Sequence, residues 1–382
     1  MKKTGLILLI VGQLFFLSCG EDEDNPTPQG TEINTNIPET VWSDVMGGSS
    51  TLKRGAISFD DQSNIYLAGV YDGNPQVNDL PSVTVGLPNG YIRKFDEDGE
   101  GLFTEDLGFS VANDLHYLAF TEDAILLAGS YRSSGSVFYF SLDEEGNQLG
   151  LNIFDGSGRN DEAGGLAIDP EGNILIGGTF GGGLGEVAEV FKLDAAENEQ
   201  WSYNSEGRTT LANVETDELG NVYLNQCRFT NSGKTEIVKL DTDGNIIWTK
   251  PFDFGCGDGL GVVSSNEIYF NYLTGVMRLD SNGDIIWQID SQEAAILSDL
   301  DANANGEIVI SGSYSFGGQF GNIELPRPSL TQNTKFIAMI NANGTVRWLT
   351  NQIGATDVAL NANGSVFYAD FAEGQTSFGL LR

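Results

Sequence analysis

The sequence predicts an all-β fold: a seven-bladed β-propeller with four antiparallel strands per blade and a ring closed by an N-terminal strand in the last blade. Two recurring phrases and the places of the tryptophans lead to this prediction. The first phrase, "LAIDPEGNILIGGTF" (166–180), is a short apolar run, an Asp/Asn/Gly turn and an alternating run rich in Ile, Val and Tyr. This pattern is typical of a tight antiparallel hairpin.

Both phrases recur along most of the chain. Seven copies of the first lie at 57–71, 118–131, 166–180, 214–229, 262–272, 300–314 and 358–371. The second phrase, "VKLDTDGNIIW" (238–248), predicts another hairpin, and further copies lie at 191–201, 277–287 and 338–348. Two hairpins supply four strands, and units spaced by about 40 to 60 residues are typical of propeller blades.

The tryptophans support a closed ring. Four of the five stand at one place in the fourth strand of their units: Trp201, Trp248, Trp287 and Trp348. The fifth, Trp42, lies in "TVWSDVMGG" (40–48), whereas the last unit stops at "SFGLLR" (377–382) in its third strand. We therefore expect the N-terminal segment to supply the missing fourth strand, which leaves no open sheet edge, and the tryptophans to pack between blades.

The N-terminus has the features of a targeting segment. Lys2 and Lys3 precede an apolar stretch (5–17) that is short for a membrane span. We expect a signal peptide at 1–18, an acidic tether at 19–39 and the propeller at 40–382. Ser18-Cys19 after the apolar stretch resembles a bacterial lipoprotein signal, which implies that Cys19 carries a lipid such as palmitate. The alternative is a secretory signal with an incidental cysteine.

The acidic run behind Cys19, "GEDED" (20–24), resembles the surface-export signal of lipoproteins in the Bacteroidota. This resemblance implies a lipid-anchored protein at the outer surface of the outer membrane. A plain acidic spacer that faces the periplasm is the alternative.

Charge and composition exclude several classes of function. The net charge is −35, with 19 Lys+Arg against 54 Asp+Glu, and such a field repels nucleic acid and anionic lipid. His116 is the one histidine, which excludes chemistry that needs a pair or cluster of histidines. The thiols besides Cys19 are Cys227 and Cys256, predicted on one face at neighbouring blades; a disulfide and two free thiols are both open.

The paired phrases resemble the β-propeller repeat family called SBBP, most closely at 165–180 and 238–248. The Leu-Asp-x-x-Gly-x-x-x-Trp hairpin is also similar to the quinoprotein-type repeat of the outer-membrane assembly lipoprotein family. Both resemblances imply a fold and say little about function.

The inner strands should line a central channel, and their equivalent positions are Ala56, Tyr117, Gly165, Asn213, Gly261, Asp299 and Asp357. Asp299 and Asp357 lie on adjacent blades, and such a pair could hold Ca²⁺ or act as acid and base. Alternatively, channel water or turn amides solvate both. Near the start of the inner strands lie Arg54, Asp114, His116, Glu162 and Asp258.

A second candidate set lies at the ends of the second strands. Most units have small residues and an aromatic there, but three units have polar residues instead. Its members are Asn225, Gln226, Arg228, Asn271, Tyr272 and Asp370. Amides, Arg and aromatics suit a sugar or peptide chain, although drift within the repeat explains them too. The long segments 72–90 and 315–334 are candidate binding loops, each able to fold as a small hairpin over the top face.

Asp-Gly turns such as "DTDGN" (241–245) resemble the start of a calcium loop, but they lack its distal Glu and suit any tight hairpin. We therefore expect a non-catalytic, monomeric propeller without a cofactor that binds or scaffolds a protein or a polysaccharide at the cell envelope. The alternative is a Ca-dependent hydrolase or lyase that acts on a sugar or lactone in the channel.

Overall fold

A computed structural model describes residues 37–47, 55–74, 80–81, 88–108, 114–131, 135–154, 161–181, 185–229, 233–291, 295–328, 333–372 and 375–382. All of them belong to one compact unit, Ile33–Arg382. The expected signal peptide, Cys19, most of the tether and Arg54 lie outside the described residues. Within the described ranges we find no helix with the length and apolar character needed to cross a bilayer.

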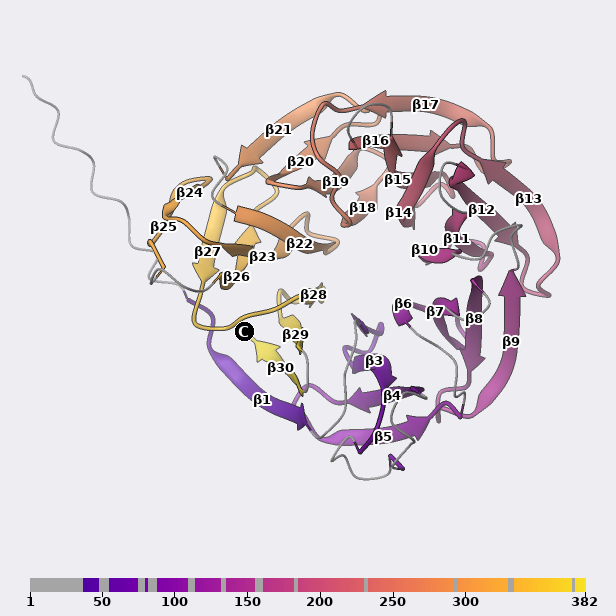
Figure 1. The fold of residues 1–382 in the computed structure, drawn as a ribbon, viewed down its shortest axis with the longest axis horizontal. Coiled ribbons are helices and arrows are strands. Elements are labelled where there is room, and N and C mark those ends of the chain that lie inside the picture. The colour runs from indigo at the N-terminus through magenta and orange to yellow at the C-terminus, as the bar shows by residue number, and fades with distance from the viewer. Residues whose placement is uncertain are drawn as a thin grey trace, which may run out of the picture. The chain divides into compact units, whose positions relative to one another are not determined.

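The described residues form seven four-stranded antiparallel sheets arranged as the blades of a ring, so the predicted seven-bladed propeller is confirmed (Figure 1). From the channel outwards, blades 1 to 3 are β2 (Ala56–Phe59), β3 (Ile65–Tyr71), β4 (Asn89–Phe95), β5 (Gly101–Asp106); β6 (Asp114–Phe120), β7 (Ile125–Tyr131), β8 (Ser136–Leu142), β9 (Gln148–Phe154); and β10 (Glu162–Ile168), β11 (Ile174–Phe180), β12 (Val187–Leu193), β13 (Glu199–Asn204).

Blades 4 to 6 continue in the same order as β14 (Thr209–Thr216), β15 (Val222–Phe229), β16 (Gly233–Leu240), β17 (Ile246–Pro251); β18 (Leu260–Ser264), β19 (Glu267–Tyr272), β20 (Gly275–Leu279), β21 (Ile285–Asp290); and β22 (Ala295–Ala302), β23 (Ile308–Tyr314), β26 (Thr334–Ile340), β27 (Val346–Thr350). In blades 1 to 6 the second strand is largely buried, because neighbouring blades cover both of its faces.

Blade 7 joins the two ends of the chain. It consists of β28 (Asp357–Leu360), β29 (Val366–Ala372), β30 (Gln375–Leu381) and, as its outer strand, β1 (Thr40–Gly47). Trp42 on β1 is paired with Leu380 on β30. The N-terminal strand therefore closes the ring in the last blade, as the sequence predicts.

The tryptophans of the second phrase join neighbouring blades, as expected. In four cases the indole N–H on an outer strand donates to the carbonyl of the second residue in the outer hairpin turn of the next blade: Trp42 to Glu97 (3.1 Å), Trp201 to Thr242 (2.9 Å), Trp248 to Ser281 (3.0 Å) and Trp287 to Ala342 (2.9 Å). We call this arrangement a tryptophan clamp.

The clamp explains the glycine of the phrase. Gly244 is the fourth residue of its turn and has φ +82°, and a Cβ there would lie 2.8 Å from the Trp201 ring. Only glycine combines this backbone conformation with so close an approach. In blade 3 the turn has Glu197 at this position with φ 65°, and the preceding blade has Gly150 in place of a tryptophan. The turn thus accepts a side chain where no indole covers it.

Within a blade, the lysine of the second phrase reaches the turn of the first. Lys192 lies 2.8 Å from Asp169, and their side chains are only 6% and 1% exposed. Blade 6 has Met339 and Asn303 at the equivalent positions, so the cation and the carboxylate are exchanged together for neutral groups.

The long segment of blade 6 contains the expected hairpin, β24 (Gly318–Phe320) and β25 (Ile323–Leu325), but its place differs from the prediction. The Asn322 side chain bonds both the N–H and the carbonyl of Val346 on β27, the outer strand of blade 6. Phe320 and Leu325 are buried in the core of blades 5 and 6. The hairpin thus covers an outer edge rather than the top face, because its apolar side chains are buried there. The segment of blade 1 lies largely outside the described residues.

Candidate functional site

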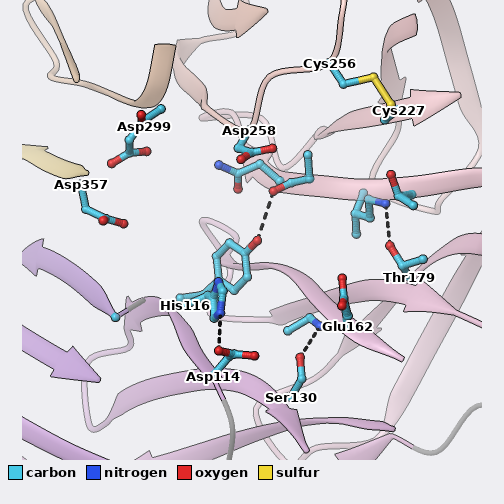
Figure 2. Close-up of a pocket in the computed structure, with 18 residues that line it drawn as sticks. Asp114, His116, Ser130, Glu162, Thr179, Cys227, Cys256, Asp258, Asp299 and Asp357 are labelled. Carbon is cyan, nitrogen blue, oxygen red and sulfur yellow. Dashed lines mark hydrogen bonds and ion pairs between the residues drawn. A yellow bond between two sulfur atoms is a disulfide. The ribbon is translucent and has the colours of Figure 1, made fainter. Parts of the chain in front are cut away.

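A cavity of about 720 Å³ lies at the channel, where the inner strands of several blades converge. Five carboxylates line it: Asp114, Glu162, Asp258, Asp299 and Asp357. His116 lines it too, and no Lys or Arg is among the described residues that do so. Figure 2 shows these side chains arriving from different blades around one space. The cavity thus gathers every described residue of the predicted channel-mouth set together with the predicted Asp299–Asp357 pair.

Bulges in the inner strands direct some of these residues to the cavity. The pairing of β6 with β7 skips His116, that of β14 with β15 skips Ala212, and that of β22 with β23 skips Ser298. All three skipped residues line the cavity. A bulge re-aims a side chain and is common beside functional sites.

Tyr117 extends across blade 3 and donates from its hydroxyl to the carbonyl of Ala212 in blade 4, at 3.2 Å. Blade 3 has Gly164 and Gly165 at this level, where a Cβ would meet the β14 backbone at 2.6 Å. The missing side chains let the inner strands approach and leave room for the tyrosine. His116 Nε2 lies 3.7 Å from Asp114 Oδ1, so the histidine faces an acidic group on its own strand.

The Asp299–Asp357 pair joins blades 6 and 7. Asp299 accepts hydrogen bonds from the N–H of Leu300 at 2.8 Å and of Val358 at 2.9 Å. Burial, and then the charge of Asp357, raise the pKa of Asp299 well above its usual range. Asp299 therefore keeps its proton to a higher pH than an isolated aspartate does. Of the sequence-based alternatives, solvation by backbone amides is the nearest to the structure, although the amides at Asp299 belong to the strands β22 and β28 and not to turns.

Two further carboxylates of the inner strands were missed by the sequence reasoning. Asp301 accepts from the N–H of Ala302 and Leu360, and burial raises its pKa to about 6. Burial, and then the charge of Asp301, raise the pKa of Glu215 to about 8. Both occupy the position of Ala167 in blade 3, two residues after the channel position that we had compared between units. A comparison of this second position would have found them.

One wall of the cavity shows how blades are joined at the channel. The Ser130 hydroxyl accepts from the N–H of Ala163 (2.8 Å), and the Thr179 hydroxyl accepts from the N–H of Leu211 (3.0 Å), each in the next blade. Cys227 occupies the equivalent position in blade 4 and forms a disulfide with Cys256 of the loop before blade 5. Of the two alternatives left open by the sequence, the structure has the disulfide, and it replaces a hydrogen bond by a covalent link.

The second candidate set is not gathered at the cavity, because its side chains meet neighbouring backbone and charged groups. Asn225 Nδ2 donates to the carbonyls of Gly257 and Gly259, and Asn271 Oδ1 accepts from the N–H of Gly259. The remaining contacts are Gln226 with Tyr203, Arg228 with Glu236, Tyr272 with Asp290 and Asp370 with Lys335. These residues hold strands and interblade loops together.

The Asp-Gly turns bind their own backbone. Asp241 accepts from the N–H of Asp243 and Asn245 and from the Asn245 side chain, and the amide of Asn245 holds its pKa below the usual range. In the part of the chain that the structure describes, no group of three or more His, Cys, Asp or Glu side chains is placed to hold a metal ion.

Comparisons with known proteins support the fold alone. No protein-family model and no curated protein matches the sequence. Among solved structures, a streptogramin B lyase is 12% identical with a TM-score of 0.58, over 89% of this chain and 97% of that one. Inactive virginiamycin B lyase from Staphylococcus aureus with quinupristin is 10% identical with a TM-score of 0.59, over 89% and 99%.

The Pan2 WD40 domain of Neurospora crassa is 10% identical with a TM-score of 0.55, over 87% of this chain and 89% of that one. The propeller fold thus occurs in lyases and in a WD40 domain. The fold does not decide between an enzyme and a non-catalytic protein.

Proposed function

We propose that the protein is a non-catalytic binding module of the cell envelope whose channel cavity holds a basic segment of a protein partner. The cavity and its five carboxylates carry this proposal. A cavity with one sign of charge and low-dielectric walls concentrates ligands of the opposite charge. A volume of about 720 Å³ lies in the range that binding sites use for ligands the size of a few side chains.

The test uses the purified protein with trilysine as probe and triglutamate as the matched anionic control. We expect trilysine to raise the melting temperature by mass action and its affinity to fall with added salt. Glu162→Gln and Asp258→Asn, both at exposed side chains of the cavity, should weaken binding. Glu122→Gln, an exposed carboxylate in the turn between β6 and β7, should leave it unchanged. Equal effects of all three variants would contradict the proposal.

A polysaccharide partner and a Ca-dependent enzyme are the competing functions. The Asp299–Asp357 pair favours the enzyme, because one protonated and one ionised carboxyl can act as acid and base. Against this role, both oxygens of Asp299 already accept backbone hydrogen bonds. Soluble glycans and Ca²⁺ belong in the same melting experiment. If glycans or Ca²⁺ raise the melting temperature and trilysine does not, the ligand is a glycan or Ca²⁺ and not a basic segment.

For the location, we propose that Cys19 is lipidated and anchors the propeller at the outer membrane, facing outwards. The Ser18-Cys19 sequence and the acidic run behind it support this proposal, and the Cys227–Cys256 disulfide fits an oxidising compartment. Labelling of cells with a palmitate analogue should mark the protein, and Cys19→Ser should abolish the label. Protease added to intact cells should degrade the propeller if it faces outwards and spare it if it faces the periplasm.

A further inference from the structure

The outer strand of blade 2, β9, differs from the other outer strands in its exposed side chains (Figure 1). Leu149, Leu151 and Ile153 alternate along it and are 60%, 39% and 54% exposed. Phe154 belongs to the opposite face, where its ring stacks on Phe191 of blade 3 with 5.3 Å between the ring centroids. One face of β9 is thus fixed on the neighbouring blade, and the other presents a row of aliphatic side chains to solvent.

The repeat shows that this row is particular to blade 2. Gly150 occupies the place of the clamp tryptophan, so the three positions can be compared directly between blades. In every other blade at least one of the three is a polar residue or proline: Leu102, Thr104, Asp106; Gln200, Ser202, Asn204; Ile247, Thr249, Pro251; Ile286, Gln288, Asp290; Arg347, Leu349, Asn351; and Val41, Ser43, Val45. The blade therefore does not require an unbroken aliphatic row at its outer strand.

The free edge of β9 also lacks the residues that protect the other outer edges. Among the described residues β9 pairs with β8 alone, so its other edge offers N–H and C=O groups to a further strand. Charged residues and proline discourage such pairing, and each of the remaining six outer strands contains at least one of them: Asp44, Glu105, Asp106, Glu199, Lys250, Pro251, Asp290 and Arg347. The strand β9, "QLGLNIF" (148–154), contains none.

Blade 6 shows how an outer edge of this propeller is covered. The Asn322 side chain of its extra hairpin bonds the backbone of Val346 on β27, and Phe320 and Leu325 of the same hairpin are buried. Contact with the backbone of the edge is thus combined with burial of apolar side chains. The outer edge of β9 offers both features, since it has unpaired backbone groups and an aliphatic row beside them.

The charges near β9 indicate which kind of strand fits it. The turn before β9 contains Glu144 and Glu145, both exposed. Glu105 of blade 1 lies against this turn, because a Cβ on Gly146 would be 2.7 Å from its Cγ. A partner with Lys or Arg beside its apolar residues is complementary to these charges. A second copy of the chain, with its own net charge of −35, is repelled instead.

We propose that β9 is a docking edge for an extended segment of a protein partner, with alternating aliphatic residues and Lys or Arg next to them. The segment adds a fifth strand to blade 2 through backbone hydrogen bonds. Its aliphatic side chains pack on Leu149, Leu151 and Ile153, and its basic residues face Glu144 and Glu145. The edge is separate from the channel cavity, so this proposal does not depend on the ligand of the cavity.

The test is hydrogen exchange of the purified protein, measured by mass spectrometry on fragments that contain β9. The probe is the peptide Val-Thr-Val-Thr-Val-Lys-Lys. In the free protein we expect fast exchange of the β9 amides that point away from β8 and slow exchange of those that bond to it. Addition of the probe should protect the first group of amides, whereas exchange in β13 of blade 3 should not change.

Matched peptides separate strand addition from unspecific binding. Replacement of the two lysines of the probe by glutamates should weaken binding at least tenfold, and added salt should weaken the binding of the lysine peptide. N-methylation of alternate amides along one edge of the probe should abolish binding, because it removes the donors that face β9. The same modification along the other edge should preserve binding.

Matched variants test whether the probe binds at β9. Leu151→Lys should weaken binding at least tenfold, because it interrupts the aliphatic row and places a like charge against the lysines of the probe. Ser202→Lys, at the same position of blade 3, should bind the probe as the wild type does. Both substitutions are at exposed positions, so both variants should keep the melting temperature of the wild type, which also shows that each is folded.

Three results would overturn the proposal. Slow exchange along both edges of β9 in the free protein would mean that another part of the chain already covers the edge. Self-association in analytical ultracentrifugation that Leu151→Lys prevents would make a second copy the occupant. Equal binding of the lysine and glutamate peptides, or equal binding of the probe by Leu151→Lys and Ser202→Lys, would mean that β9 recognises no basic strand.

Discussion

Asp301→Asn should stabilise the protein at alkaline pH and destabilise it at acidic pH. In the wild type, the two carboxylate oxygens of Asp301 accept from the N–H of Ala302 (2.8 Å) and, in the next blade, of Leu360 (2.7 Å). Asparagine keeps one acceptor oxygen and turns an NH₂ group towards the other donor. The substitution therefore removes a charge and one hydrogen bond while keeping the shape of the side chain.

The magnitude follows from the pKa. Burial raises the pKa of Asp301 from 3.8 to about 6, so the folded protein binds this proton more tightly than the unfolded chain does. The ionised side chain therefore costs stability above pH 6, and this cost disappears as the pH falls below 4. At about 1.4 kcal/mol per pKa unit, the cost is at most about 3 kcal/mol, because channel water reaches part of the side chain.

The lost hydrogen bond costs about 1 kcal/mol at any pH. Asp301→Asn should thus be about 2 kcal/mol more stable than the wild type at pH 8 and about 1 kcal/mol less stable at pH 4. The gain at pH 8 should be larger still, since the Asp301 charge also raises the pKa of Glu215. Apart from this effect on Glu215, the difference between variant and wild type cancels the pH dependence of the other carboxylates.

The assay is urea unfolding of both proteins at pH 4, 6 and 8, with Asp123→Asn, an exposed turn residue, as control. The control should change stability by less than about 0.5 kcal/mol at every pH. A constant loss of stability for Asp301→Asn across the pH range would refute the reasoning, because it would mean that the folded and unfolded states bind the proton of Asp301 equally.

Three further predictions concern the junctions and the blades. Cys227→Ser should lower the free energy of unfolding by about 3 to 4 kcal/mol, as expected for a disulfide across 29 residues, and reductant should bring the wild type to the same melting temperature. Gly244→Ala should cost more than about 1 kcal/mol, whereas Glu197→Gly at the same turn position should be neutral or stabilising; equal losses in urea unfolding would contradict the clamp. Lys192→Met alone should cost about 3 kcal/mol, because the buried Asp169 carboxylate keeps its hydrogen bonds from Glu171 and Asn173 but loses its counter-charge. Adding Asp169→Asn should restore most of this loss, which a double-mutant cycle measures.

The sequence predicted the architecture because the same turn recurs in most blades and five of the seven blades contain the tryptophan. Asp-x-x-Gly and Trp are separated by a fixed number of residues, so their copies could be aligned by eye. The closure of the ring could be predicted from Trp42, because this tryptophan lies before the first complete unit and the last unit lacks its fourth strand. Local chemistry that recurs from blade to blade specifies a fold more firmly than any single segment does.

The candidate site was only partly predictable, because sequence position does not say which neighbour a side chain meets. Asp114 and Glu162 were expected at the channel and line the cavity. Asn225 and Asn271 looked like ligand-binding exceptions, yet the loop before blade 5 runs over the ends of their strands and takes their hydrogen bonds. The disulfide required the distance between two blades, which no spacing along the chain provides.

The construction of blade 7 also constrains how the protein can be made. β1 is the first strand of the propeller to leave the ribosome, and its partner β30 is the last. Until then the outer edge of the unfinished blade is unpaired, and the contact that completes it spans nearly the whole chain. Such non-local pairing is slow and exposes aggregation-prone edges. The propeller therefore cannot close before β30 has been made, and an exported chain of this design would need to be kept unfolded, or shielded by chaperones, until β1 and β30 meet.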